Sequence, residues 1–195
     1  MDILYEEGDL QFAVAKHDDN QKTDYLKVRT SIWNKPGWAN VPEGQYETDE
    51  FDSSATCVVI MHKGQVIGGF RLISAQKADL LPFAEYCERK LADSGPAFEI
   101  SRWCINPQLP KRVRTAAHAV MIKGTLLYLK SLKITVGYMD VCAFLFKFLG
   151  RSGIKVTRLG SEHCREDGTA FVPAALDVIE SVTHLGLIEE VKACA

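Results

Sequence analysis

The sequence predicts an α/β fold, in which a mixed central sheet is flanked by helices on both faces. Three observations lead to this prediction. Strand-like segments dominate the first half after one opening helix, strands and helices alternate in the second half, and no repeat or linker divides the chain. A chain of 195 residues can enclose one core of useful size. We therefore expect residues 1–195 to form a single domain.

The first half of the chain opens with a short strand and one helix. Tyr25, Val28 and Ile32 share one face of that helix, with the spacing of a buried stripe. Further on, β-branched residues and a Lys-Gly turn indicate a hairpin. The elements predicted in this half are a strand over 10–15, the helix over 23–33, an ordered loop over 34–53, and hairpin strands over 56–61 and 66–73.

The second half alternates between helices and strands. Its longest element is an amphipathic helix over residues 113–131, whose apolar side chains follow the helical repeat. The elements predicted are a helix over 82–91, a strand over 97–105, the long helix over 113–131, a strand over 134–139, a helix over 141–151, strands over 154–159 and 171–178, and a short helix over 189–193.

Composition and charge exclude several classes of protein. Apolar residues make up 47% and charged residues 25%, which is typical of a folded globular chain. The net charge of −2 provides no overall basic field, so we expect no nucleic-acid partner. The acidic N-terminus does not resemble a signal peptide, and the most apolar stretch, residues 141–149, is too short to span a bilayer. We expect a cytoplasmic protein with no membrane partner.

Cysteine and histidine spacing gives no sign of a metal site. The six cysteines are scattered without a C-x-x-C pair, as is typical of reduced thiols in a cytoplasmic chain. The five histidines form no ligand pattern, and only His163 and Cys164 are adjacent. We expect no bound metal.

Charged residues on apolar strands are the first indication of a functional site. Arg71 lies on the apolar face of its strand, where an arginine needs carboxylate partners because an unpaired buried charge is costly. On the strand over 97–105, strict alternation places Glu99 and Ser101 on one face and Arg102 on the other, unless a bulge intervenes.

Carboxylates and aromatic residues come from nearby segments. The acidic run over residues 47–52 directly precedes a strand and offers several carboxylates at a sheet end. Arg29 and Trp33 are four positions apart on the first helix and so share one side, and Trp38 follows in the loop. For any one of these residues taken alone, a structural role in a solvated acidic loop with ion pairs is more common than a functional role.

Three motifs in order resemble those of the autoinducer synthase family. ETDEFD at residues 47–52 resembles its E-x-D-x-[FY]-D signature, GFRL at 69–72 resembles its G-x-R-L strand end, and FEISRW at 98–103 resembles its E-[LI]-S-R-[FW] strand. The order and gaps match over residues 25–105. Single residues that look like further family positions are Arg29, Trp33, Trp38 and Phe83.

The resemblance implies an N-acetyltransferase-like (GNAT) three-layer sandwich and a role in quorum sensing. Members transfer an acyl group from acyl-carrier protein, or sometimes acyl-CoA, to the amine of S-adenosylmethionine, and lactone closure then expels methylthioadenosine. S-adenosylmethionine is thus a substrate, and no separate cofactor is expected. We expect residues 1–105 to form the S-adenosylmethionine-binding and catalytic half, and residues 106–195 the acyl-chain and carrier-binding half.

The resemblance and the chemistry of acyl transfer together assign roles to residues. Glu99 is expected to remove the proton from the amine through water, with Ser101 as a positioning hydroxyl and Arg102 beside it. Backbone N–H groups after the Glu99 strand are expected to stabilise the thioester oxyanion. The residues expected to bind S-adenosylmethionine are Arg29, Trp33, Trp38, Asp49, Asp52, Arg71 and Phe83.

The acyl donor is expected to contact the second half. Lys111, Arg112 and Arg114 open the long helix and suit an acidic carrier protein or its phosphopantetheine, with a solvated basic turn as an equal alternative. The residues expected to line an acyl pocket, each with plain core packing as its alternative, are Met139, Val141, Phe144 and Phe148. Competing hypotheses are an N-acyl amino acid synthase, another GNAT-like acyltransferase, and an inactive binding module.

Overall fold

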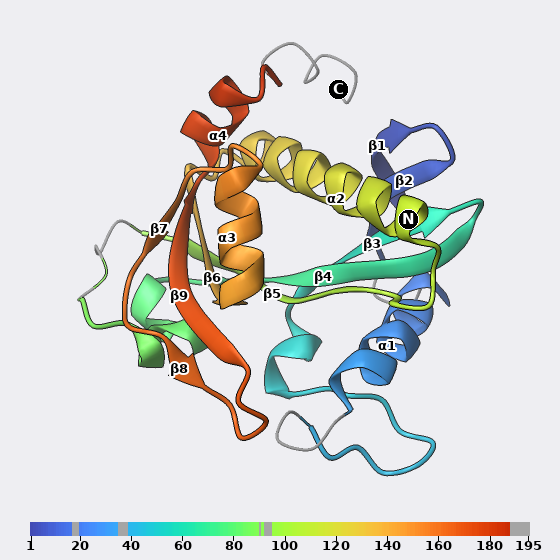
Figure 1. Cartoon of the computed structure of the whole chain (residues 1–195), viewed down its shortest axis with the longest axis horizontal. Coiled ribbons are helices and arrows are strands. Elements are labelled where there is room, and N and C mark those ends of the chain that lie inside the picture. The colour runs from blue at the N-terminus through green and yellow to red at the C-terminus, as the bar shows by residue number, and fades with distance from the viewer. Residues whose placement is uncertain (17–19, 35–38, 90, 92–94, 188–195) are drawn as a thin grey trace. The chain divides into compact units, whose positions relative to one another are not determined.

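The computed structural model describes residues 1–16, 20–34, 39–89, 91 and 95–187 (Figure 1). The strands are β1 Asp2–Glu7, β2 Leu10–Ala15, β3 Thr56–His62, β4 Gln65–Ala75, β5 Ala97–Ile105, β6 Val136–Cys142, β7 Val156–Arg158, β8 His163–Cys164 and β9 Ala170–Asp177. The α-helices are α1 Asn20–Trp33, α2 Lys111–Ser131, α3 Ala143–Arg151 and α4 Val178–His184, and the 3₁₀ helices are η1 Glu50–Ser53, η2 Ala78–Leu80 and η3 Pro82–Tyr86.

The strand order is β1-β2-β3-β4-β5-β6-β9-β7, and β8 pairs with β9. The chain forms two compact units. Unit 1 contains residues 1–72 and 102–125, and unit 2 contains residues 73–101 and 126–195. The units interleave along the sequence, because β4, β5 and α2 each contribute residues to both.

Unit 1 contains an antiparallel sheet between two helices. Strands β1 to β4 pair in sequence order, each antiparallel to the next. On one face, Tyr25 of α1 packs with Ala13, Val59 and Cys104 in a buried cluster. On the other face, a Cβ atom added to Gly124 of α2 would lie 2.4 Å from the Phe12 ring, so helix and sheet are in close contact there.

Two glycines in β4 allow neighbouring backbones to approach closely. A Cβ atom on Gly68 would lie 2.3 Å from the carbonyl oxygen of Cys104, and one on Gly69 would lie 2.1 Å from that of Val58. Both distances are far below van der Waals contact, so no larger residue fits without moving a strand. The two glycines therefore allow β4, the strand that carries Arg71, to pack closely against its neighbours.

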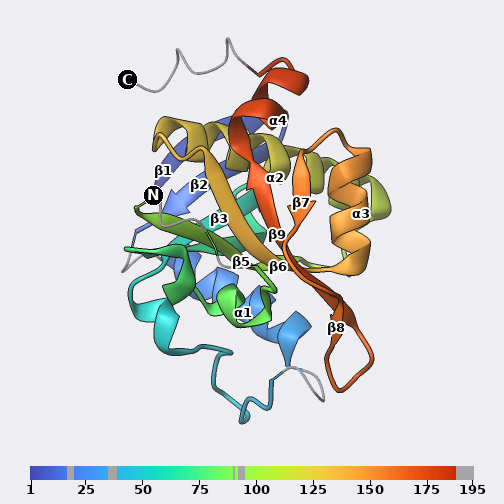
Figure 2. The ribbon, with the colours of Figure 1, turned by 90° about the vertical axis from the view of Figure 1, so that its left-hand side faces the viewer.

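Unit 2 is built around β6 and β9, which pair antiparallel over their full length. Strand β5 runs parallel to β6, with Glu99 opposite Tyr138. Gly137 faces Leu129 of α2 on one side of the sheet, while the ring of Tyr138 stacks on Phe83 of η3 on the other, with centroids 4.9 Å apart. Figure 2 shows α3 beside β7, and β8 in the hairpin that leads into β9.

Most sequence-based element boundaries agree with the structure to within two or three residues. The strands predicted over 10–15 and 97–105 have the same bounds as β2 and β5, and the long helix begins at Lys111. The helix predicted over 82–91 is wrong in type and length, since η3 is a 3₁₀ helix that ends at Tyr86. Proline at its first position suits a short turn of this kind.

Five elements were not anticipated: the strands β1 and β8, the helix α4, and the 3₁₀ helices η1 and η2. Strand β1 is an exposed edge strand without apolar alternation, and α4 is only seven residues long, with Asp177 as its N-cap accepting from the amide of Glu180 at 2.7 Å. The short helix predicted over 189–193 lies outside the described residues. No helix in the part of the chain that the structure describes is both long and apolar enough to cross a membrane.

Candidate active site

Unit 1 carries a cluster of six paired charges, which we call the ion-pair ring. One arginine comes from each of α1, β4 and β5, two carboxylates come from the loop that leads into η1, and the third comes from η1 itself. The members of the ring are Arg29, Arg71, Arg102, Glu47, Asp49 and Asp52. The prediction that a buried arginine at 71 needs carboxylate partners is confirmed.

Arg29 joins the two ends of the acidic motif. Its Nη1 and Nη2 donate to Oδ1 and Oδ2 of Asp52 at 2.6 and 2.9 Å, a bidentate pair. Its Nε donates to Oε2 of Glu47. A planar guanidinium with a fixed fork of donors is suited to hold two carboxylates at once.

Arg102 and Arg71 close the ring from the sheet. Arg102 donates from Nε to Oε1 of Glu47 at 3.0 Å and from Nη2 to Oδ2 of Asp49 at 3.2 Å. Arg71 donates from Nη2 to Oδ2 of Asp49 at 2.7 Å, and its Nη1 lies 3.1 Å from Oδ2 of Asp52. Each charge is therefore bound to two of opposite sign, and the ring is neutral as a whole.

The acidic motif folds in a way that aims its carboxylates. Asp49 is the N-cap of η1 and accepts from the amide of Phe51 at 3.0 Å, while Asp52 accepts from the amide of Asp49 at 2.8 Å. This reciprocal capping box orients both side chains through hydrogen bonds that are local to the motif. The amide of Glu47 donates to Oγ1 of Thr30 at 2.8 Å, which ties the loop to α1.

Pairing outweighs the cost of burying these charges. Arg29 and Arg71 are almost completely buried, whereas Asp52 is 14% exposed. Burial acts to raise the pKa of Asp52, but hydrogen bonds and charge from Arg29 lower it to about 2. Burial likewise acts to lower the pKa of Arg29, and hydrogen bonds to Asp52 and Glu47 raise it above its usual range. All these groups are charged at neutral pH.

The ring has a buried side and an open edge. Arg102 and Asp49 are each 22% exposed, the largest exposed fractions in the ring. The guanidinium of Arg102 lies over the ring of Trp33, 4.7 Å from its centroid. This edge therefore exposes a cation and an anion, and the buried indole of Trp33, only 8% exposed, lies directly against the cation.

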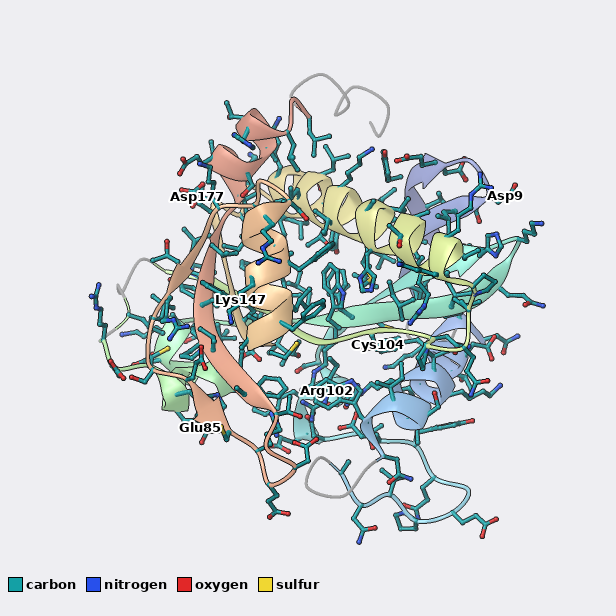
Figure 3. The ribbon with its side chains drawn as sticks, in the orientation of Figure 1. Asp9, Glu85, Arg102, Cys104, Lys147 and Asp177 are labelled. Carbon is teal, nitrogen blue, oxygen red and sulfur yellow. The ribbon has the colours of Figure 1, made fainter. Side chains whose placement is uncertain are left out.

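An unusual backbone conformation directs Arg102 to this edge. Its φ is 57°, a left-handed value inside a strand, and its carbonyl oxygen accepts from the hydroxyl of Tyr25 at 3.2 Å. The strict alternation of side chains along the strand therefore does not extend through Arg102. Figure 3 labels Arg102 with Cys104, which packs in the cluster around Tyr25.

Unit 2 carries the expected base. Glu99 is only 3% exposed, and its Oε2 accepts from the backbone amide of Phe83 at 2.9 Å. The ring of Phe83 in turn stacks on Tyr138. Ser101, two residues along β5, is half-buried. Phe83 is thus placed with Glu99 in this unit.

The remaining candidate residues have mixed surroundings. Met139 and Val141 are buried in β6. Phe148 on α3 is half-buried, whereas Phe144 is 78% exposed, so in this structure its side chain faces outward. Trp38 lies outside the described residues.

The basic residues open α2. Lys111 and Arg112 are exposed in the first turn of the helix, and Arg114 is half-buried.

One member of the ion-pair ring, Glu47, was not among the expected binding residues. Its place as the first letter of the acidic motif was the signal that could have identified it.

The chain was compared with protein families and solved structures. A family model described as autoinducer synthase matches residues 15–183. The AHL synthase LasI superposes with a TM-score of 0.73 at 19% identity, covering 91% of this chain and 94% of that chain. TofI, in a ternary complex with an inhibitor and MTA, has a TM-score of 0.73 at 15% identity, covering 93% and 98%.

A CoA-dependent acyl-homoserine lactone synthase, MesI, has a TM-score of 0.68 at 20% identity and covers 90% of this chain and 93% of that chain. No curated protein matches the chain at a significant level. The predicted α/β fold with a mixed central sheet, of the acetyltransferase-like type, is confirmed by these likenesses. At such identities a shared structure shows the fold alone.

Proposed function

This chain belongs to the autoinducer synthase family, and from that premise we propose that it is an acyl-homoserine lactone synthase that acts in quorum sensing. The amine nitrogen of S-adenosylmethionine attacks the thioester carbon of an acyl donor. The carbon–sulfur bond breaks, the amine loses a proton, and the thiol of the carrier leaves. The substrate carboxylate then displaces methylthioadenosine from the carbon next to the sulfonium, which closes the lactone.

The ion-pair ring is the observation that carries this proposal. Its open edge combines a guanidinium, a carboxylate and an indole, which complement the carboxylate, ammonium and sulfonium groups of S-adenosylmethionine. A cation–π contact of this kind contributes about 0.5–2 kcal/mol. We assign Arg29, Asp52 and Arg71 to holding the edge in place, and Asp49, Arg102 and Trp33 to contact with the substrate.

The saturation of the ring favours this division of roles. Every carboxylate pairs with two arginines, and Asp52 is less exposed than Asp49, so Asp52 is assigned to positioning Arg29 and Arg71. Because the ring is closed before substrate binds, little reorganisation is required at the moment of reaction. Trp38 and Phe83 complete the proposed substrate-binding set.

Glu99 is proposed as the base. Its burial and its hydrogen bond from the Phe83 amide hold one carboxylate oxygen in a fixed position, as a base acting through an ordered water requires. Ser101, half-buried two residues further along β5, is assigned to positioning the substrate.

The acyl donor is proposed to be an acyl-carrier protein or acyl-CoA. Exposed Lys111 and Arg112, with Arg114 behind them, offer positive charge at a helix N-terminus for a carrier protein or a pantetheine phosphate. Met139, Val141 and Phe148 are proposed to line the acyl pocket, and Phe144 reaches it only if its side chain turns inward. In this scheme residues 1–105 supply substrate binding and catalysis, and residues 106–195 the acyl and carrier functions.

A cytoplasmic location is proposed for the same protein. The five cysteines among the described residues are free thiols, which agrees with a reducing compartment.

Incubation with S-adenosylmethionine and a panel of acyl-carrier proteins and acyl-CoA thioesters tests the function. Mass spectrometry should detect methylthioadenosine and an acyl-homoserine lactone in equal amounts. A parallel incubation with free amino acids in place of S-adenosylmethionine tests the alternative, and an N-acyl amino acid formed there would indicate an N-acyl amino acid synthase instead. Absence of product with every donor would contradict enzymatic acyl transfer and favour a binding module.

A further inference from the structure

Unit 2 contains a second group of polar and aromatic side chains that the reaction scheme does not use. Nε2 of His163, on β8, lies 2.9 Å from Oδ1 of Asp140, on β6. The imidazole stacks on the ring of Tyr86, at the end of η3, with centroids 3.9 Å apart and planes 3° from parallel. We call these three residues the Asp–His–Tyr stack.

The stack lies on the same face of the sheet as the group around Glu99. Asp140 is two residues from Tyr138 on β6, and side chains two apart on a strand share a face. Tyr138 pairs with Glu99 across the strands and carries the ring of Phe83. Figure 3 labels Glu85, which lies between Phe83 and Tyr86 on η3.

The helix η3 is therefore held at both ends. At its start, the amide of Phe83 donates to Glu99 and its ring stacks on Tyr138. At its end, Tyr86 stacks on His163, whose ring plane is set by the hydrogen bond to Asp140. A 3₁₀ helix of five residues has little stability of its own, so its position depends on tertiary contacts such as these two anchors and the backbone hydrogen bond from Glu88 to Leu159 just beyond it.

A hydrogen bond between Asp140 and His163 orients the imidazole at the end of η3 more strictly than an apolar contact would. The side chain of Asp140 is only 10% exposed. Burial raises the pKa of Asp140, and the hydrogen bond with His163 opposes that rise. A buried carboxylate needs a hydrogen-bond partner in one defined geometry, and Nε2 of His163 lies at hydrogen-bond distance from it. The pair thus sets the orientation of the imidazole, which apolar packing alone would leave less defined.

We propose that Asp140, His163 and Tyr86 are positioning residues that fix η3, so that the amide of Phe83 keeps the Glu99 carboxylate aligned for proton removal. This inference rests on the role of Glu99 in the proposed function. The three residues act through Phe83 and do not touch the reacting atoms. Their loss should therefore change turnover more than the affinity for S-adenosylmethionine.

The test uses three single variants of the full chain, the double variant Asp140→Ala/His163→Ala and one control. His163→Ala removes the stack, Asp140→Ala removes the carboxylate, and Asp140→Asn keeps an oxygen that accepts from Nε2 of a neutral histidine. Glu162→Ala is the matched control, because it breaks an exposed ion pair with Arg158 beside His163.

Turnover and amide exchange are measured together. We expect His163→Ala and Asp140→Ala each to lower kcat about tenfold or more, the scale of a small misalignment of a catalytic group, with KM for S-adenosylmethionine within about twofold. The double variant should be no worse than the single variants, because they break one contact. Asp140→Asn and Glu162→Ala should stay close to the wild type.

Hydrogen exchange separates positioning from general loss of stability. The amide of Phe83 should exchange at least about tenfold faster in His163→Ala, while the amide of Val59, in the core of β3, changes less. Equal acceleration at both amides, an unchanged rate at Phe83, or wild-type kcat in His163→Ala would overturn the inference. If the wild type forms no product from any donor, the proposed function is wrong, and the exchange rate of Phe83 still decides whether the stack holds η3.

Discussion

Replacement of Asp52 by asparagine should destabilise the chain through the ion-pair ring. Asparagine keeps the shape of the side chain and removes its charge, so Arg29 loses its bidentate partner while remaining fully buried. The pKa of Asp52 falls from 3.8 to about 2 on folding, which corresponds to roughly 2 kcal/mol of stability at neutral pH. Removal of one partner of a fully buried pair has been found to cost about 3–5 kcal/mol. We expect a loss of about 2–3 kcal/mol.

The pH dependence gives the sign of this effect. Because the pKa of Asp52 is lower in the folded chain, its contribution is fully present above pH 3.8 and is lost as the pH falls toward about 2. Urea denaturation of wild type and Asp52→Asn should therefore give a difference in unfolding free energy that is constant above about pH 5 and closes toward pH 2.

An exposed ion pair provides the control for the same chemical change. Asp24 pairs with Lys27 at 2.8 Å, and both side chains are about half exposed or more. Asp24→Asn should cost well under about 1 kcal/mol. The reasoning would be refuted if the two variants lost equal stability, or if the Asp52 difference persisted unchanged at pH 2.

Three further predictions concern the reaction. Glu99→Gln should lower kcat by about 10²-fold, as expected on loss of a general base; near-normal turnover in a rapid-mixing assay would remove Glu99 from that role. Trp33→Ala should raise KM for S-adenosylmethionine about fivefold, whereas Trp33→Phe should stay within about twofold because it keeps a ring under Arg102; equal effects would argue against an aromatic contact. Lys111→Glu with Arg112→Glu should raise KM for an acyl-carrier protein most at low salt; a KM that does not respond to the charge reversal would exclude this docking surface.

Much of the fold was predictable from local patterns. The alternation of apolar side chains in β2 and β5 and the apolar stripe of α2 are patterns within short continuous segments. The bounds of these elements could therefore be predicted from the sequence. Strand β1 has no such pattern, because it lies at the sheet edge and its side chains are largely exposed. Helix α4 is stabilised by its cap and its packing against β6 and β9, and its length gives too few positions for a periodic signal.

The second anchor of η3 illustrates what local patterns miss. His163 was noted in the sequence only as the neighbour of Cys164, with no sign of a partner. Asp140 lies 23 positions earlier, and the two meet because β6 and β8 both pair with β9. Tyr86 joins them from a third segment.

The sequence by itself identified five of the six members of the ion-pair ring. The acidic motif, the arginine in β4 and the Glu99 strand were all identified from residue types, order and spacing, and the capping box of Asp49 and Asp52 is local to four residues. Only the tertiary structure decided that the six charges close into a ring with Glu47 as the link between Arg29 and Arg102. It also decided that Arg102 adopts a left-handed conformation and reaches the open edge. The physical reason is that ion pairs between distant segments depend on where the backbone places their charges, and burial then selects the one arrangement in which every charge is paired.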